Sequence, residues 1–118
     1  MKRFNKLIIA CDGESASGKS TAARLVSKKY DLLLVNSGLL YRYGSKLLIN
    51  HKPKNKISFL RKKFKEISYT KIAKQNLHSQ DISEHVAYLA KNKHFRKIVN
   101  GFQKKIIKNN KKICIEGR

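Results

Sequence analysis

Apolar residues form three short continuous runs along the chain, separated by polar segments and longer helical patterns. The runs cover residues 7–11, 32–35 and 113–115, the first within a strand predicted at about 6–11, and consecutive rather than alternate positions are apolar. Such runs are typical of parallel strands that are buried on both faces. Three of them, with helical patterns between, predict an α/β fold built on a parallel sheet.

Helical patterns connect the predicted strands. Residues 19–29 form the first helix and end in a basic turn, which suits the negative end of a helix. Ser37 can cap a second helix over 39–49, and the polar stretch 51–56 with the only proline is a connector. Residues 66–72 alternate enough to predict a weak strand. Further helices are expected at 57–65, at 81–91, and along the apolar face formed by Phe95, Ile98, Val99, Phe102, Ile106 and Ile107.

A phosphate-loop motif follows the first apolar run. Residues 13–20 match G-x-x-x-x-G-K-[ST] at every fixed position. Glycines let backbone N–H groups point at phosphate oxygens, the lysine reaches the β- and γ-phosphates, and the serine hydroxyl can ligate Mg²⁺. The alternative is a glycine-rich turn that binds nothing. The motif predicts an ATP site made by Gly13, Glu14, Ser15, Ala16, Ser17, Gly18, Lys19, Ser20 and Thr21, in which Lys19 is also catalytic and Ser20 holds Mg²⁺.

The chain of 118 residues suits a single small domain, and 41% hydrophobic residues can supply a core. Its formal net charge is +21, which raises the question of a nucleic-acid partner. The cations are mostly lysines spread through the chain, with clusters at 52–56, 61–65 and 104–112. We interpret most of them as a solvated face with weak nonspecific affinity for polyanions. A basic nucleic-acid-binding module with a relic phosphate loop is the alternative.

Cysteine, histidine and hydropathy patterns favour a cytoplasmic protein without a disulfide or metal framework. Cys11 and Cys114 lie in apolar runs, where a cysteine usually serves as a small buried hydrophobe. The four histidines have no zinc-site spacing. No apolar stretch is long enough to cross a membrane, and the N-terminal Lys-Arg precedes only a five-residue apolar run.

Three segments resemble, in type and order, those of the bacterial cytidylate kinases, a family of P-loop nucleoside monophosphate kinases. Residues 11–21 resemble the family's Asp-Gly phosphate loop, 36–42 its Asp-Ser/Thr-Gly-x-x-Tyr-Arg segment, and 113–118 its Asp-Gly-Arg-Asp segment. The resemblance covers the whole chain and is weakest in the middle. It implies transfer of the γ-phosphoryl group of ATP to CMP or dCMP with Mg²⁺. Another P-loop kinase of small molecules is the alternative.

The resemblance also implies an acceptor site. Its residues are Ser37, Tyr41, Arg42, Arg96 and Arg118, with Arg118 also catalytic and Glu116 placed to hold Mg²⁺ through water. Three positions depart from the family pattern. Asn36 occupies the position of an Asp, Glu14 that of a Pro, and Ala87 that of a Ser that contacts the base. We therefore expect phosphate handling to be better preserved than base selectivity.

The resemblance describes residues 1–118 as the N-terminal part of one kinase domain, a parallel sheet with flanking helices truncated to about three core strands. Residues 1–50 hold the phosphate loop and the start of the acceptor site, 51–92 a shortened acceptor-binding insert, and 93–118 a helix and the third strand. Family members are longer and carry an arginine-bearing lid, so we expect this fragment to be impaired or inactive, and monomeric if complete. With the family's strand order 2-3-1-4-5, the first strand lies at an open edge that invites pairing.

Overall fold

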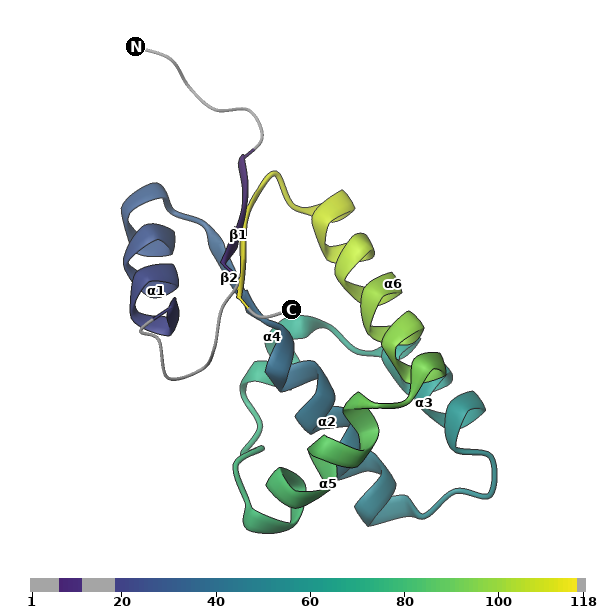
Figure 1. Ribbon diagram of the computed structural model, residues 1–118. Coiled ribbons are helices and arrows are strands. Elements are labelled where there is room, and N and C mark those ends of the chain that lie inside the picture. Colours follow the sequence, from purple (N-terminus) through teal and green to yellow (C-terminus); the bar gives the residue numbers. More distant parts are fainter. Residues whose placement is uncertain (1–6, 12–18, 117–118) are drawn as a thin grey trace. The chain divides into compact units, whose positions relative to one another are not determined.

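The computed structural model describes residues 7–11 and 19–116, which form three strands and six helices (Figure 1). In chain order these are β1 (Leu7–Cys11), α1 (Lys19–Tyr30), β2 (Leu33–Asn36), α2 (Ser37–His51), α3 (Lys56–Glu66), α4 (Tyr69–Ala73), α5 (Gln80–Ala90), α6 (Lys93–Asn109) and β3 (Lys112–Glu116). The chain divides into two compact units. The sheet unit holds residues 1–37 and 105–118, and the helical unit holds residues 38–104.

The three strands of the sheet unit are parallel, in the order β1-β3-β2. This confirms the predicted α/β fold and the order implied by the resemblance, and it leaves β1 at one edge of the described sheet. Leu32 and Cys114 are buried together, with Ile9, Val26 and Leu34 packed against them. The interpretation of Cys114 as a small buried hydrophobe is therefore confirmed.

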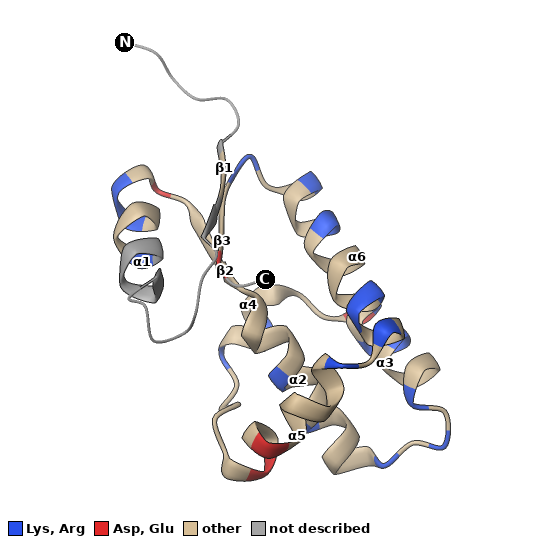
Figure 2. Cartoon of the chain, viewed as in Figure 1, with Lys and Arg blue, Asp and Glu red and all other residues tan. Residues whose placement is uncertain are grey.

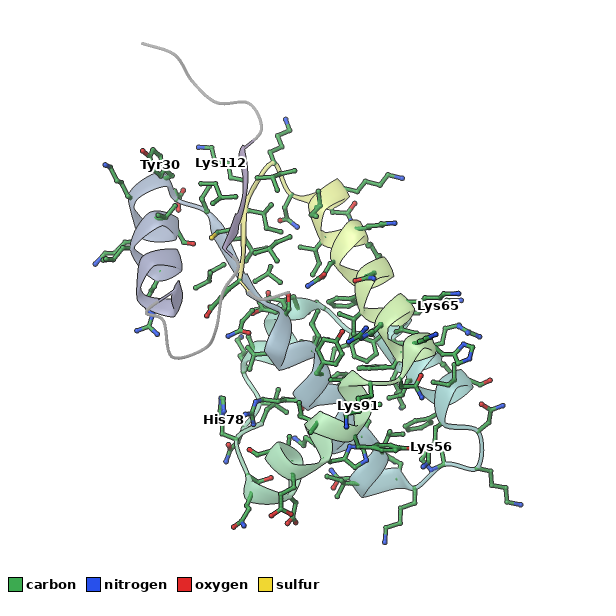
Figure 3. The ribbon with its side chains drawn as sticks, in the orientation of Figure 1. Tyr30, Lys56, Lys65, His78, Lys91 and Lys112 are labelled. Atoms are coloured by element: carbon green, nitrogen blue, oxygen red, sulfur yellow. The ribbon has the colours of Figure 1, made fainter. Side chains whose placement is uncertain are left out.

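The helical unit is built around aromatic side chains from three helices. The ring of Phe95 on α6 meets the rings of Tyr41 on α2 and Phe64 on α3 nearly edge-on, with centroids 5.4 and 5.5 Å apart. Phe64 also contacts the ring of Phe102 at 5.5 Å and that of Tyr43 at 5.4 Å. Figure 3 shows side chains filling the space between these helices. Edge-on pairs of this kind add to the stability that burial provides.

Most predicted helices are present, with small shifts at their ends. The helix expected at 57–65 is α3, and Asn55 caps it by accepting a hydrogen bond from the Ser58 amide at 3.1 Å. The helix expected to begin at 39 begins at Ser37, directly after β2. The apolar face predicted for α6 is confirmed because Phe95, Val99, Phe102 and Ile106 are buried.

The weak strand predicted at 66–72 is wrong, because the chain forms helix α4 there. Ser68 precedes the helix and its hydroxyl accepts a hydrogen bond from the amide of Lys71. Ile67 and Tyr69 are half-buried between exposed neighbours, so the alternation does follow burial, but the segment forms a helix in which Ile72 is the buried residue. A local cap decides the structure here, since a strand needs a neighbour to pair with. No helix in the described ranges combines the length and apolarity needed to span a membrane.

Candidate nucleotide site

The carboxyl ends of the three strands meet at one edge of the sheet unit. Glu116, the last residue of β3, is the register partner of Cys11 on β1 and of Asn36 on β2. In open α/β sheets ligands bind outside the carboxyl ends of the strands. Glu116 is only 6% exposed, so this edge holds a buried carboxylate between the ends of β1 and β2.

The phosphate-loop motif lies between β1 and α1. Its first six residues, 13–18, fall outside the described residues, but the elements on both sides are present: β1 ends at Cys11 and α1 begins at Lys19. The first amides of a helix lack intrahelical acceptors and, with the helix dipole, favour bound anions. Lys19, Ser20 and Thr21 belong to the first turn of α1, as the motif predicts, although the structure does not describe their side chains.

Ser37 belongs to the same edge of the sheet unit. It follows Asn36 directly as the first residue of α2, and its side chain is 2% exposed. The sheet unit therefore brings together Ser37, Glu116 and the end of β1 from which the phosphate-loop motif departs. Gly117 and the predicted site residue Arg118 lie outside the described residues.

Arg42 is anchored within the helical unit. Its Nη1 donates hydrogen bonds to the carbonyl oxygen of Leu77 at 3.0 Å and to the hydroxyl of Ser83 at 3.0 Å. These bonds connect α2 to the segment that leads into α5 and to the first half of α5. One guanidinium nitrogen is thus held in place. These two bonds do not use Nε and Nη2, whose N–H groups lie in one plane and can donate to an anion.

Arg96 is anchored in the same way at the other end of α5. Its Nε donates to the carbonyl oxygen of Ala90, the last residue of α5, at 2.8 Å. A cation suits this end of a helix, where carbonyl oxygens carry the negative end of the dipole. The two predicted acceptor arginines therefore hold opposite ends of one helix.

Tyr41 and Arg96 lie close enough to interact electrostatically. Burial against Phe95 raises the pKa of the Tyr41 phenol above 10.0, and the positive charge of Arg96 opposes part of that shift. The phenol is thus protonated at neutral pH and can donate a hydrogen bond. The helical unit therefore brings Tyr41 near Arg96 at the last residue of α5 and holds Arg42 toward the start of that helix, whereas the sheet unit holds Ser37 and Glu116.

Sequence reasoning missed the groups that anchor the arginines. They are the carbonyl oxygens of Leu77 and Ala90 and the hydroxyl of Ser83. Backbone carbonyls leave no trace in the residue pattern, and Ser83 sits in a helix without any motif around it. Ala87, which departs from the family pattern, is exposed on α5 one helical turn after Ser83.

Comparison with known proteins decides the family. The family model described as cytidylate kinase matches residues 9–118. The chain belongs to the cytidylate kinase family. This membership agrees with the parallel sheet, with the strand order and with the position of the phosphate-loop motif between β1 and α1.

Individual cytidylate kinases align along nearly the whole chain. The enzyme of Mesomycoplasma hyopneumoniae strain 7448 is 33% identical over 132 residues, covering 98% of this chain and 56% of the relative. The enzyme of Aquifex aeolicus is 30% identical over 122 residues, which cover 93% of this chain and 54% of the relative. A bifunctional pantoate ligase/cytidylate kinase of Prochlorococcus marinus strain MIT 9215 is 35% identical over 125 residues, which cover 90% of this chain and 24% of the relative. The chain thus spans about half the length of the cytidylate kinases that it matches.

Proposed function

We propose that this chain binds ATP and CMP or dCMP as part of a cytidylate kinase, which makes a nucleoside diphosphate and ADP. The observation that carries the proposal is the register at the carboxyl edge of the sheet. It sets the buried Glu116 beside the end of β1, from which the phosphate-loop motif leads into α1. The family match supports the choice of acceptor.

The donor side of the proposal rests on the phosphate-loop motif and α1. Backbone amides at the start of α1, with Lys19, would hold the triphosphate. Ser20 and Glu116 would supply hard oxygen ligands, which fit Mg²⁺, and Glu116 is buried at the carboxyl edge of the sheet. An ion held by these oxygens would supply positive charge that offsets the negative charge of the phosphates.

The acceptor side of the proposal rests on the residues that the family resemblance names. Arg42 and Arg96 would bind the monophosphate, since each guanidinium is already oriented through a protein oxygen. Tyr41 would lie along the nucleotide with its phenol protonated. Ser37, at the start of α2, would contact the acceptor from the sheet edge. Arg118 would add a further acceptor-side cation.

In the reaction, an oxygen of the CMP phosphate attacks the γ-phosphorus of ATP, and the bond from that phosphorus to the β–γ bridging oxygen breaks. CDP forms and ADP leaves. Lys19 and the arginines balance the negative charge of the phosphates that must approach one another. Positioning and charge, rather than covalent catalysis by the protein, carry this chemistry.

Isothermal titration of the 118-residue chain with ATP and with CMP tests the proposal. Lys19→Ala should weaken ATP binding, and Arg42→Ala or Arg96→Ala should weaken CMP binding, each by about 10-fold or more, since each removes a bond to a charged group. The matched controls are Lys28→Ala and Arg61→Ala, which remove exposed cations of α1 and α3. These controls should leave both affinities within about 2-fold.

Acceptor choice is tested by titrating CMP, dCMP, UMP, AMP and GMP in parallel. Tightest binding of a cytidine nucleotide supports the proposal, and equal or tighter binding of a purine nucleotide favours another P-loop kinase. ADP release, followed in the same samples, tests the expectation that this chain alone transfers phosphoryl groups poorly. If CMP binds equally well to Arg42→Ala, Arg96→Ala and the parent chain, the acceptor assignment is wrong.

A further inference from the structure

Helices α3 and α6 of the helical unit present exposed cations on the sides opposite their buried residues. On α3 the buried positions are Leu60 and Phe64, and on α6 they are Phe95, Val99 and Phe102. The exposed cations lie between about a quarter and about half a helical turn away from these positions. We call them the basic face, which consists of Arg61, Lys62 and Lys65 on α3 and Lys93, Lys97 and Lys104 on α6.

The two helices are direct neighbours. The ring of Phe64 on α3 contacts the rings of Phe95 and Phe102 on α6, both at 5.5 Å. Because Phe95 and Phe102 are two helical turns apart, α3 packs along α6 rather than touching it at one point. The outer sides of two packed helices adjoin, so the six cations share one surface. Figure 3 shows Lys65 pointing away from the helical core.

Two of the three acidic residues of the helical unit lie on α5, away from the basic face. The three residues are Glu66, at the end of α3, and Asp81 and Glu84, both near the start of α5. Figure 2 shows blue along α6 and α3, with red at the end of α3 and at the start of α5. The structure gives none of the six cations an ion pair within the residues that it describes.

Other lysines of the same unit have partners within the protein. Lys56 lies over the ring of Tyr88 at 5.7 Å, Lys63 lies over the ring of Phe59 at 5.6 Å, and Lys46 donates to the side-chain oxygen of Gln75 at 3.0 Å. The cations of the basic face thus differ from these lysines in being directed to solvent. Like charges held on one surface repel one another, and a polyanion relieves that repulsion.

The chemistry of the basic face selects among possible partners. The large apolar side chains that are exposed in the described part of the chain are Ile8, Leu25, Tyr30 and Tyr88, none of them on α3 or α6. An amphipathic helix that lies on a membrane needs such side chains beside its cations, and a protein interface needs apolar or aromatic anchors. A polyphosphate strand needs neither, because counterion release drives its binding.

We propose that the basic face binds the phosphodiester backbone of single-stranded nucleic acid without reading its sequence. Lysines act as mobile point charges that follow a flexible backbone, and neither α3 nor α6 carries a fully exposed Phe or Tyr to stack on bases. Arg42 and Arg96 are not members of the face, so the proposal stands apart from the acceptor site.

Fluorescence anisotropy with a labelled 20-nucleotide single-stranded RNA of mixed sequence tests the proposal. The variant Lys65→Gln/Lys97→Gln/Lys104→Gln removes three charges from the face. The control Lys54→Gln/Lys74→Gln/Lys91→Gln removes three exposed lysines of the same unit outside the face, with the same change in net charge. Thermal unfolding checks that both variants remain folded.

The face variant should bind RNA at least about 10-fold more weakly at moderate salt. The slope of log binding constant against log salt concentration should become shallower by about 2, since each lost phosphate contact on a single strand accounts for about 0.7. The control should change affinity by less than about 2-fold. The proposal is supported if the face variant loses affinity for RNA or for DNA of the same sequence. The ratio of the two affinities of the parent chain shows which nucleic acid it prefers. Equal losses in both variants, no binding by the parent chain, or tighter face-dependent binding to phosphatidylserine vesicles or polyglutamate would overturn it.

Discussion

A Cβ atom built on Gly44 would lie 2.5 Å from Cζ of Phe95, closer than real Cβ atoms approach another heavy atom. It would also lie 3.0 Å from Cδ2 of Leu89. Phe95 is fully buried, and its ring is flanked by those of Tyr41 and Phe64, so it has little room to move aside. The contact of α2 with α6 in the helical unit therefore depends on the absence of a side chain at Gly44.

Replacing Gly44 by alanine should destabilise the protein. The added methyl group must displace a packed aromatic ring, and overpacking of this kind costs about 1–3 kcal/mol. This cost exceeds the roughly 0.5–1 kcal/mol by which alanine favours a helix over glycine. Urea denaturation followed by circular dichroism measures the change in the free energy of unfolding.

Gly101→Ala provides the matched control. Gly101 is also within a helix, but a Cβ there meets nothing within 4 Å. The same substitution should therefore stabilise the protein by about 0.5–1 kcal/mol, because only the helix preference remains. Changes of the same sign at both positions would contradict the packing that the structure shows.

Substitutions of Ser83 and Ser79 distinguish two roles, the anchoring of Arg42 and the capping of α5. Ser83 accepts a hydrogen bond from Arg42, whereas the Ser79 hydroxyl accepts one from the amide of Ile82 at 3.3 Å and caps the helix. Ser83→Ala should weaken CMP binding several-fold, since the guanidinium loses one of the two oxygens that orient it. Its effect on stability should stay within about 1 kcal/mol, because the hydrogen bond is exposed.

Ser79→Ala should show the opposite pattern. Loss of the cap should cost about 1 kcal/mol of stability, while the bonds of Arg42 to Leu77 and Ser83 remain. Urea denaturation and isothermal titration with CMP, run on both variants, give the two quantities. If Ser79→Ala weakens CMP binding as much as Ser83→Ala does, the hydroxyl of Ser83 has no particular role in orienting Arg42.

The anchors of the arginines show where sequence reasoning ends. The strands and α6 could be predicted because their apolar residues recur with a period that directly reflects burial. Arg42 could be named from a motif, but the oxygens that hold it lie 35 and 41 residues further along the chain. Only the packing of α5 beside α2 brings them together, and no local pattern encodes that packing.

Helix α4 shows a second limit of the sequence. At 66–72 an approximate alternation predicted a strand, but the Ser68 hydroxyl caps a short helix there. Alternation over a few residues does not distinguish a strand from the end of one helix followed by the start of another, as at Glu66 and Tyr69. Local capping and the need of a strand for a partner decide such segments.

The pKa of His85 should make stability depend on pH. Its Nδ1 is 2.9 Å from the hydroxyl of Ser45, and burial, with the positive charge of Lys56, lowers the pKa of His85 below 6.5. As pH falls through about 6.5, the unfolded chain takes up a proton that the folded chain does not. The free energy of unfolding should therefore be higher above this pH and decrease as the solution is acidified.

His85→Asn should reduce this pH dependence, because it removes the titrating group and keeps a polar side chain near Ser45. Urea denaturation at several pH values between about 5.5 and 7.5 measures the slope. Lys56→Gln should reduce the slope in part, since it removes the smaller cause of the shift. An unchanged slope in His85→Asn would show that His85 does not contribute to it.

Ser27 of α1 is buried, 6% exposed, and its hydroxyl has no hydrogen-bond partner among the described residues. An unsatisfied buried hydroxyl costs about 1–3 kcal/mol, and serine favours a helix less than alanine does. Ser27→Ala should therefore leave the stability unchanged or raise it by about 1 kcal/mol, as measured by urea denaturation.

Ser45→Ala is the matched comparison, because Ser45 is fully buried but its hydroxyl is bonded to His85. The same change should here cost about 0.5–1.5 kcal/mol, the usual net contribution of a hydrogen bond. The difference between the two serines isolates the value of the partner, since residue type, helix environment and burial are alike. A loss of stability in Ser27→Ala as large as that in Ser45→Ala would mean that the hydroxyl of Ser27 does have a partner in solution.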